Sequence, residues 1–175
     1  MSEKSRSVEI WELVHPLMNR ERWLEAIKLL KKDFFVVQDD WKLSWNLAWC
    51  YFKLGRLDEA RTHMIRAVRL APANATCRFG MGAVYLERKQ FKKAEANSAE
   101  SLRLKDSYFA RIHLALAYTE QGKLTEAENV HLEGIKLKPK SSRRYEAYAD
   151  FLSDAGREEE AQKMYEKAKK LRQQN

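Results

Sequence analysis

The sequence predicts an all-α protein, an α-solenoid of five helix-turn-helix repeats, and three observations support this prediction. Apolar residues recur at three- and four-residue steps along most of the chain, which is the period of a helix with one buried face. Glycine or proline interrupts these segments at intervals, as expected at the ends of short helices. The whole pattern returns every 33 or 34 residues, so each helix pair has a similar neighbour to pack against.

Residues 41–74 form the clearest copy of the repeat. Their first helix is predicted from apolar residues on one face, namely Leu43, Leu47, Ala48, Tyr51 and Leu54. Gly55 ends this helix, because glycine enters the left-handed C-cap conformation without steric cost. A second helix follows, and Pro72 stops it, because proline cannot continue a helix.

Four further copies align with this one. The five repeats are residues 7–40, 41–74, 75–107, 108–141 and 142–175. One column of the alignment is always alanine: Ala26, Ala60, Ala94, Ala127 and Ala161. The tight-turn column contains Gly55, Gly122 and Gly156, with Glu21 and Lys89 in the other two repeats. We therefore expect residues 7–175 to form a single domain, preceded by a disordered tail at residues 1–6.

On these columns and this period, the chain resembles the tetratricopeptide-repeat (TPR) family, whose 34-residue helix-turn-helix pattern it follows. The resemblance implies a right-handed superhelix in which the first helices of successive repeats line a concave groove. It also implies a protein-binding module, an adaptor or scaffold or a chaperone-like protein.

Two repeats depart from the pattern. In the first, Pro16 lies inside the first helix and should kink or break it, and the second helix is predicted over Arg22 to Val37. In the third, Gly80 and Gly82 lower helix propensity but let a neighbouring helix approach closely, and one residue is missing near Asp106. We expect the third repeat to be a soft joint.

Composition limits the location and chemistry of the protein. No run of 18 apolar residues is present among the 175, and the first ten residues lack the apolar segment of a secretory signal, so we expect a cytoplasmic protein without membrane partners. In that compartment Cys50 and Cys77 should be reduced and buried. The net charge is +8; the second and third repeats are basic and the first is acidic.

No constellation in the sequence supports catalysis. The four histidines fall in four separate predicted helices, without a metal-binding spacing. No glycine-rich phosphate loop is present. We therefore predict a protein that is not an enzyme, with no catalytic residues, no metal site and no cofactor.

The candidate site is the groove that the TPR resemblance implies. Its predicted peptide-binding residues are Trp11, His15, Trp45, Asn46, Trp49, Phe52, Lys53, Phe79, Ile112, His113 and Leu116. The wider set of groove-lining positions adds Lys42, Ala83, Leu86, Glu87, Phe109, Arg143, Glu146 and Asp150. Helical spacing alone places Trp45, Trp49 and Phe52 on one stripe, where they either bind a ligand or fill space between repeats. The lysine, asparagine and arginine set with which some TPR adaptors hold a peptide carboxylate is absent.

Three functional hypotheses follow. The first is binding of a peptide segment of another protein in an apolar groove with tryptophan anchors. The second is a self-assembling structural protein, a homodimer formed through uncapped terminal helices. The third, which the sequence disfavours, is nucleic-acid binding through basic residues of the middle repeats, namely Arg61, Arg66, Arg69, Lys92 and Lys93.

Overall fold

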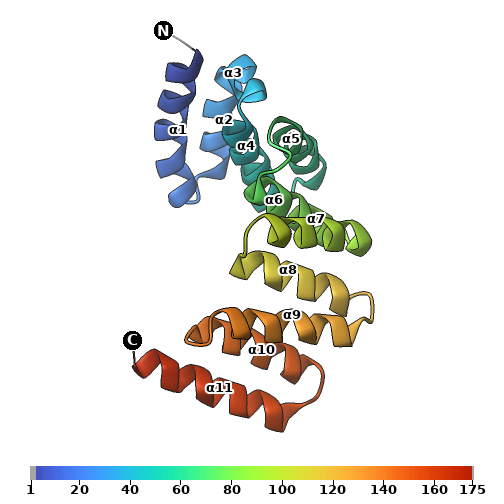
Figure 1. The fold of residues 1–175 in the computed structure, drawn as a ribbon. Helices are drawn as coiled ribbons and strands as arrows, with labels where there is room; N and C mark the ends of the chain where they lie inside the picture. The colour runs from blue at the N-terminus through green and yellow to red at the C-terminus, as the bar shows by residue number, and fades with distance from the viewer. Residues whose placement is uncertain (1–2, 175) are drawn as a thin grey trace. The chain divides into compact units, whose positions relative to one another are not determined.

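The structure, a computed structural model, describes residues 3–174, except for the side chains of residues 3–5, 34 and 38. It is helical throughout this part of the chain (Figure 1). The helices group into two compact units, residues 1–105 and residues 106–175, which we call unit 1 and unit 2. The boundary after Lys105 lies next to the position where the third repeat lacks a residue, and the single domain over residues 7–175 stays a prediction.

Unit 1 contains the helices of the first three repeats. They are α1 (Glu3–Asn19), α2 (Trp23–Lys32), α3 (Phe34–Asp39), α4 (Trp41–Lys53), α5 (Leu57–Leu70), α6 (Ala75–Glu87) and α7 (Phe91–Leu104). Each helix packs against the next, and α4 also contacts α1, α2 and α6. The helix α4 therefore lies at the centre of this unit.

Unit 2 contains the last two repeats. They form α8 (Tyr108–Thr119), α9 (Leu124–Leu137), α10 (Ser142–Asp154) and α11 (Glu158–Gln173), each packed against the helix that follows it (Figure 1). In both units, α4, α6, α8 and α10 begin at the first residue of a predicted repeat. The predicted helix-turn-helix pattern is confirmed in these four repeats.

The alanine column lies where the two helices of each repeat meet. Its members are at most 1% exposed: Ala26, Ala60, Ala94, Ala127 and Ala161. A larger side chain at these positions would force the helices apart, because a packed interior has no spare volume. Around them, unit 1 buries larger groups such as Leu43, Leu47 and Tyr51 from α4.

The tight turns between paired helices adopt the left-handed conformation in all five repeats. The glycines at this position have φ between 71° and 75°. Glu21 and Lys89, which take the place of glycine in the first and third repeats, have φ of 57° and 55°. The prediction that these two residues substitute for the turn glycine is confirmed, at a steric cost that glycine does not carry.

The first helix differs from its prediction in two respects. It begins at Glu3, so residues 3–6 are helical rather than part of a disordered tail, and residues 1–2 lie outside the described residues. Arg6 donates hydrogen bonds of 2.9–3.0 Å to the Asp33 carboxylate, which fixes this end of α1 to the end of α2. Pro16 does not end α1, which continues through this residue to Asn19 although proline removes one backbone hydrogen bond.

The second helix of the first repeat is shorter than predicted. The sequence predicts one helix over Arg22–Val37, but α2 ends at Lys32 and α3 begins at Phe34. Asp33 interrupts the helix with φ −110° and ψ 42° while its carboxylate is held by Arg6. No glycine or proline marks this break, so the sequence pattern missed it.

The structure shows a side-chain cap on α4 and confirms the close packing predicted at Gly82. The Asp40 carboxylate caps α4 by accepting hydrogen bonds from the Lys42 N–H at 2.7 Å and the Leu43 N–H at 3.2 Å. Gly82 lies against Ser98 of α7, so close that an added Cβ would be 2.6 Å from the Ser98 hydroxyl. The helices α6 and α7 can approach this closely only because residue 82 has no side chain.

The two cysteines are buried free thiols, as predicted. Burial raises the pKa of Cys50 to about 12 and that of Cys77 to about 11, so both thiols stay protonated and poorly reactive.

None of the described helices combines the length and apolar character needed to cross a bilayer.

Candidate functional site

The most conspicuous surface feature of unit 1 is a set of four neighbouring aromatic side chains, which we call the aromatic row: Trp45, Trp49, Phe52 and Phe79. The rings of Trp45 and Trp49 stack with centroids 5.2 Å apart and an interplanar angle of 9°. Those of Trp49 and Phe52 stack at 5.0 Å. Phe79, from α6, lies 6.2 Å from Trp49. All four side chains are half-buried, so one edge of the row faces solvent.

Trp45, at the end of the row, is held by its surroundings. Its indole Nε1–H donates a hydrogen bond of 3.2 Å to the Thr76 carbonyl oxygen of α6. Gly80 makes room for the ring, because a Cβ added there would be 2.7 Å from the Trp45 Nε1 and 2.5 Å from the Met64 methyl group. Trp45 therefore packs between the second and third repeats, as one of the two readings of the sequence proposed, and it also supports the ring of Trp49.

Two other predicted groove residues of α4 lie outside the aromatic row. The Asn46 side chain is only 8% exposed, so little of its amide is available to a ligand. Lys53 is exposed, and its ammonium group lies 5.9 Å from the centroid of the Trp23 ring. Trp49 and Phe52 are thus the predicted residues of this helix that are best placed to touch a partner.

Trp11 and His15 form a separate pair on α1. Their rings stack with centroids 4.8 Å apart, and Trp11 is 42% exposed. Trp11 lines a cavity of about 200 Å³ together with Lys42 and the capping residue Asp40 of the α4 N-terminus. The structure therefore brings the predicted residues Trp11 and Lys42 together, but at a different place from the aromatic row.

Unit 2 contains a larger cavity of about 310 Å³. It lies between α8 and α10, and Leu124 and the buried His131 of α9 also line it. Two of the predicted site residues, Ile112 and Leu116, line its α8 wall, and His113 does not. The lining residues are Tyr108, Ile112, Ala115, Leu116, Thr119, Leu124, His131, Ala147, Asp150, Phe151, Asp154 and Ala155.

The α10 wall of this cavity carries two carboxylates. Asp150 and Asp154 are four residues apart, so they lie on the same face of the helix, and both are exposed. The Asp150 carboxylate accepts a hydrogen bond of 2.6 Å from the Tyr165 hydroxyl of α11. The hydroxyl therefore fixes the position of this carboxylate at the cavity mouth.

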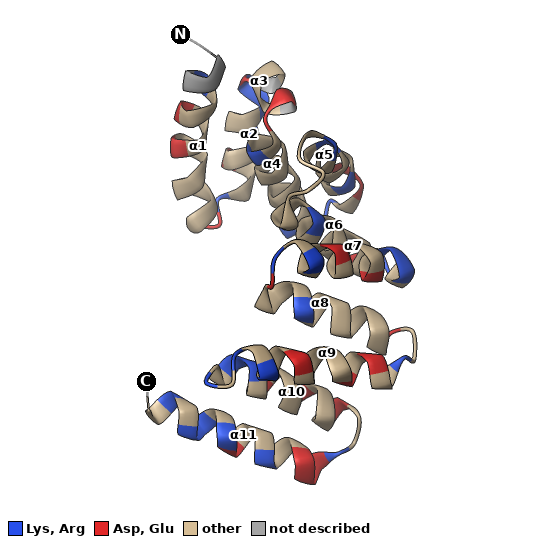
Figure 2. Cartoon of the chain, viewed as in Figure 1, with Lys and Arg blue, Asp and Glu red and all other residues tan. Residues whose placement is uncertain are grey.

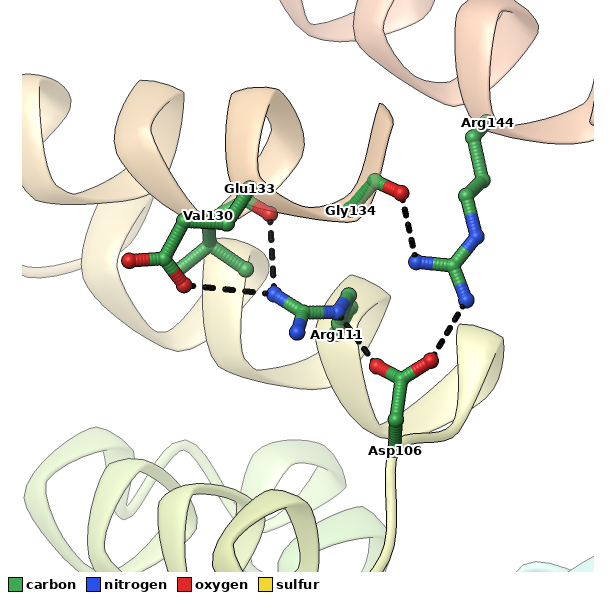
Figure 3. A network of polar contacts seen from close by, with 6 residues as sticks. All are labelled: Asp106, Arg111, Val130, Glu133, Gly134 and Arg144. Atoms are coloured by element: carbon green, nitrogen blue, oxygen red, sulfur yellow. Dashed lines mark hydrogen bonds and ion pairs between the residues drawn. The ribbon is translucent and has the colours of Figure 1, made fainter. Parts of the chain in front are cut away.

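A polar network connects α8, α9 and α10 near the start of α8 and of α10 (Figure 3). The Arg144 guanidinium, 5% exposed, donates hydrogen bonds to the Gly134 carbonyl oxygen at 2.9 Å and to Asp106 at 2.8 Å. Arg111 donates to the other Asp106 oxygen at 2.7 Å and to the Val130 carbonyl oxygen at 3.3 Å. The network therefore ties the start of α8, the last turns of α9 and the start of α10 together.

Asp106 is the shared acceptor of this network, and its charge is stabilised there. Burial by itself raises the pKa of Asp106, but the hydrogen bonds from Arg111 and Arg144 outweigh burial and lower the pKa below its ordinary value. Gly134 leaves no space for a side chain, since an added Cβ would lie 3.0 Å from Arg144 Nη1 and 3.1 Å from Arg111 Cδ. The arginines can reach α9 because residue 134 is glycine.

The two histidines of unit 2, His113 and His131, are neutral at ordinary pH. Burial lowers the pKa of His131 to about 4, and its ring packs 5.3 Å from that of Phe151, which also lines the cavity. Burial also lowers the pKa of His113 to about 4. These imidazoles act as packing groups, not as cations.

Charge is spread over several helices (Figure 2). The helix α11 begins with Glu158, Glu159 and Glu160 and carries lysines and an arginine further along, an order that suits the helix dipole. Of the basic residues in the nucleic-acid hypothesis, Lys93 lies over the Tyr85 ring and donates a hydrogen bond to the Gln90 side chain, while Arg69 and Lys92 are exposed.

Among the described residues, no cluster of three or more His, Cys, Asp or Glu side chains could hold a metal ion.

Comparison with known families agrees with the helical repeats. Three tetratricopeptide-repeat models match residues 42–107, 110–138 and 142–175, which is most of the chain. The chain belongs to the tetratricopeptide-repeat family. Tetratricopeptide repeats form a protein-interaction fold, so this assignment supports a protein-binding or scaffold module. No curated protein matches the chain.

Solved structures of MamA are similar to this TPR chain in fold. MamA from Desulfovibrio magneticus RS-1, beginning at its residue 41, has a TM-score of 0.77 at 18% identity, covering 95% of this chain and 94% of that chain. A crystal structure of MamA gives 0.74 at 20% identity, with 92% and 95% covered. A third, MamA MSR-1, gives 0.70 at 22% identity, with 97% and 98% covered. At these identities the likeness shows the fold alone.

Sequence reasoning missed part of the unit 2 cavity. It named Asp150 among the groove positions but not Asp154, although the four-residue spacing on one TPR helix could have indicated it. Phe151 and Leu124 lack such a signal, because they belong to the apolar pattern that also predicts the core.

Proposed function

We propose that the chain is a non-enzymatic adaptor or scaffold that binds an apolar peptide segment of a partner protein on the aromatic row of unit 1. The observation that carries the proposal is the stack of Trp45, Trp49 and Phe52, extended by Phe79 of α6. Tryptophan is the residue type most enriched at the energetic centres of protein interfaces. A preformed row of rings also loses little conformational entropy on binding.

The arrangement of the row favours Trp49 as its centre. Trp49 contacts three other rings of the row, whereas Trp45 is fixed on its far side by Thr76 and Gly80. A partner's apolar side chain packed on this row would cover the exposed edges of rings that are already held in place. Such binding corresponds to a helix or an extended segment lying along a groove with a few anchor residues.

The experiment is a selection of peptides from a random library on the full chain. Peptides that bind through the row should be rich in apolar and aromatic residues. Their affinity should fall at least about tenfold with Trp49→Ala, the effect of losing an interface anchor. The control is Phe35→Ala, which removes an exposed aromatic side chain of α3 outside the row. Peptides that bind Trp49→Ala as tightly as the wild type would refute the proposal.

Self-assembly is the second candidate from the sequence, and α11 gives it little support. The buried residues of α11 are Ala161, Ala168 and Leu171, and its lysines are exposed, so the last helix presents a polar outer surface. A terminal repeat with such a surface needs no further helix to cover it. A mass that rises with concentration in light scattering, and falls to that of a monomer when residues of α11 are changed, would favour self-assembly.

A further inference from the structure

The cavity of unit 2 has two chemically different sides. Apolar groups from α8 and α9 form one side, and two of them, Leu116 and Leu124, are 43% and 50% exposed at its mouth. Asp150 and Asp154 of α10 stand on the other side. A ligand that fills this space must be apolar along most of its length and must meet two carboxylates.

The carboxylates of the cavity differ from the other acidic groups nearby. Asp106 is paired with Arg111 and Arg144, Glu128 and Glu160 with Arg157, and Glu146 with Arg172. Within residues 3–174, by contrast, neither Asp150 nor Asp154 takes part in an ion pair. Arg111, Arg144, Arg157 and Arg172 are thus engaged elsewhere, and two negative charges stand beside an apolar surface.

We propose that this cavity binds the side chain of a lysine or arginine in a peptide segment of a partner protein. The inference rests on the proposed function only in taking the ligand to be a peptide, and it concerns a second surface. A lysine or arginine has a long alkyl stem that packs against apolar groups and a charged end that remains near polar groups. The stem would lie along Ile112, Leu116 and Phe151, and the charge would lie between Asp150 and Asp154.

The size and position of the groups agree with this ligand. A cavity of about 310 Å³ is at the lower end of the range for ligand sites, which suits one or two side chains rather than a folded element. The Tyr165 hydroxyl uses one Asp150 oxygen and leaves the second oxygen available to accept a hydrogen bond from the ligand. Two carboxylates on successive turns of one helix can share a single cation.

The test is a titration of the isotope-labelled full chain with three peptides, followed by nuclear magnetic resonance. The first has a central lysine between two leucines. In the second, norleucine replaces the lysine, which keeps the alkyl stem and removes the charge. In the third, glutamate replaces it. We expect the lysine peptide to shift the signals of Ile112, Leu116 and Phe151, with an affinity at least about fivefold above that of the norleucine peptide. The glutamate peptide should bind most weakly.

Two variants locate the charge recognition. In Asp150→Asn/Asp154→Asn, the affinity for the lysine peptide should fall at least about fivefold, to that of the norleucine peptide, whose own affinity should change less than about twofold. Leu116→Ala should weaken both peptides alike. Equal affinities of the lysine and norleucine peptides, no shift of the cavity signals, or full binding by the double variant would each overturn the inference.

Binding of the lysine peptide to the unit 2 cavity should not depend on the aromatic row. Trp49→Ala should bind the lysine peptide as the wild type does, because Trp49 belongs to α4 of unit 1. Peptides selected through the aromatic row should in turn bind the double Asp variant normally. A failure at either surface therefore leaves the result at the other surface interpretable.

Discussion

At the scale of single residues, the turn positions show how backbone conformation limits the choice of side chain. Gly55, Gly122 and Gly156 have nothing within 4 Å of the point where a Cβ would lie, so space does not explain why they are glycine. Their positive φ explains the choice of glycine, because glycine adopts this conformation without steric cost. Glu21 and Lys89 occupy the same conformation with a Cβ and are therefore strained.

This strain gives a prediction at Lys89. Lys89→Gly should raise the free energy of unfolding by about 0.5–1 kcal/mol. Glycine removes the steric strain of the left-handed backbone, and this gain exceeds the backbone entropy that glycine loses on folding. Chemical denaturation measures the change. The control is Ala96→Gly, an exposed position in the interior of α7, where glycine should destabilise by about 1 kcal/mol. Destabilisation by Lys89→Gly would contradict the account.

A second residue-scale prediction concerns the buried histidine His131. Its folded pKa of about 4 lies below the unfolded value of about 6.5, so between these pH values the unfolded chain binds more protons than the folded chain. Stability should therefore fall as the pH is lowered from about 6.5 to about 4, by roughly 2–3 kcal/mol for this group. His131→Leu should lose less stability over this window in denaturation measured at several pH values. Equal slopes for the two proteins would argue against a buried neutral imidazole.

At the scale of elements, the network around Asp106 shows how three helices are held by charged groups. Arg111 and Arg144 are largely buried, and both bind Asp106 while also bonding carbonyl oxygens of α9 (Figure 3). A carbonyl oxygen has two lone pairs, so the Gly134 oxygen, which already accepts a hydrogen bond from the Lys138 N–H, can also accept one from Arg144. Removing the shared acid would leave two buried cations without their counter-charge.

Asp106→Asn tests this network. It should lower the free energy of unfolding by about 2–3 kcal/mol at neutral pH, somewhat less than for a fully buried pair because Asp106 is partly exposed. Because the folded pKa of Asp106 is lowered, its contribution is present above the unfolded pKa of about 4 and disappears as the pH falls below it. The variant should therefore approach the wild type at acid pH. Asp154→Asn, an exposed acid without an ion pair among the described residues, is the matched control and should have little effect on stability.

Helices were more predictable than their interruptions. The period of apolar residues and the turn glycines sufficed to predict α4 to α11, because both signals are local. At the break, Asp33 accepts hydrogen bonds from Arg6, which is 27 residues away, and no local pattern encodes that contact. The pattern also predicted a kink or a break at Pro16, whereas α1 continues through this residue to Asn19.

At the scale of the whole molecule, the repeats determine the family but not the sites. The alanine column predicted the TPR fold, because small residues at helix crossings are required by any such repeat. The stripe of Trp45, Trp49 and Phe52 could be predicted from helical spacing, since it lies on one helix. The cavity between α8 and α10 could not be predicted completely, because it depends on side chains from three helices that meet only in the folded unit.

The central claim, that partners bind on the aromatic row, can be tested most directly through the indole N–H signals. The chain has five tryptophans, at positions 11, 23, 41, 45 and 49, and each gives one signal in a nuclear magnetic resonance spectrum of the labelled protein. When a peptide selected on the wild type is added, the account predicts that the signal of Trp49 shifts most and that of Trp45 next. The signals of Trp11 and Trp23 should remain in place. Saturating binding that moves only Trp11 or Trp23, or no indole signal, would contradict the claim.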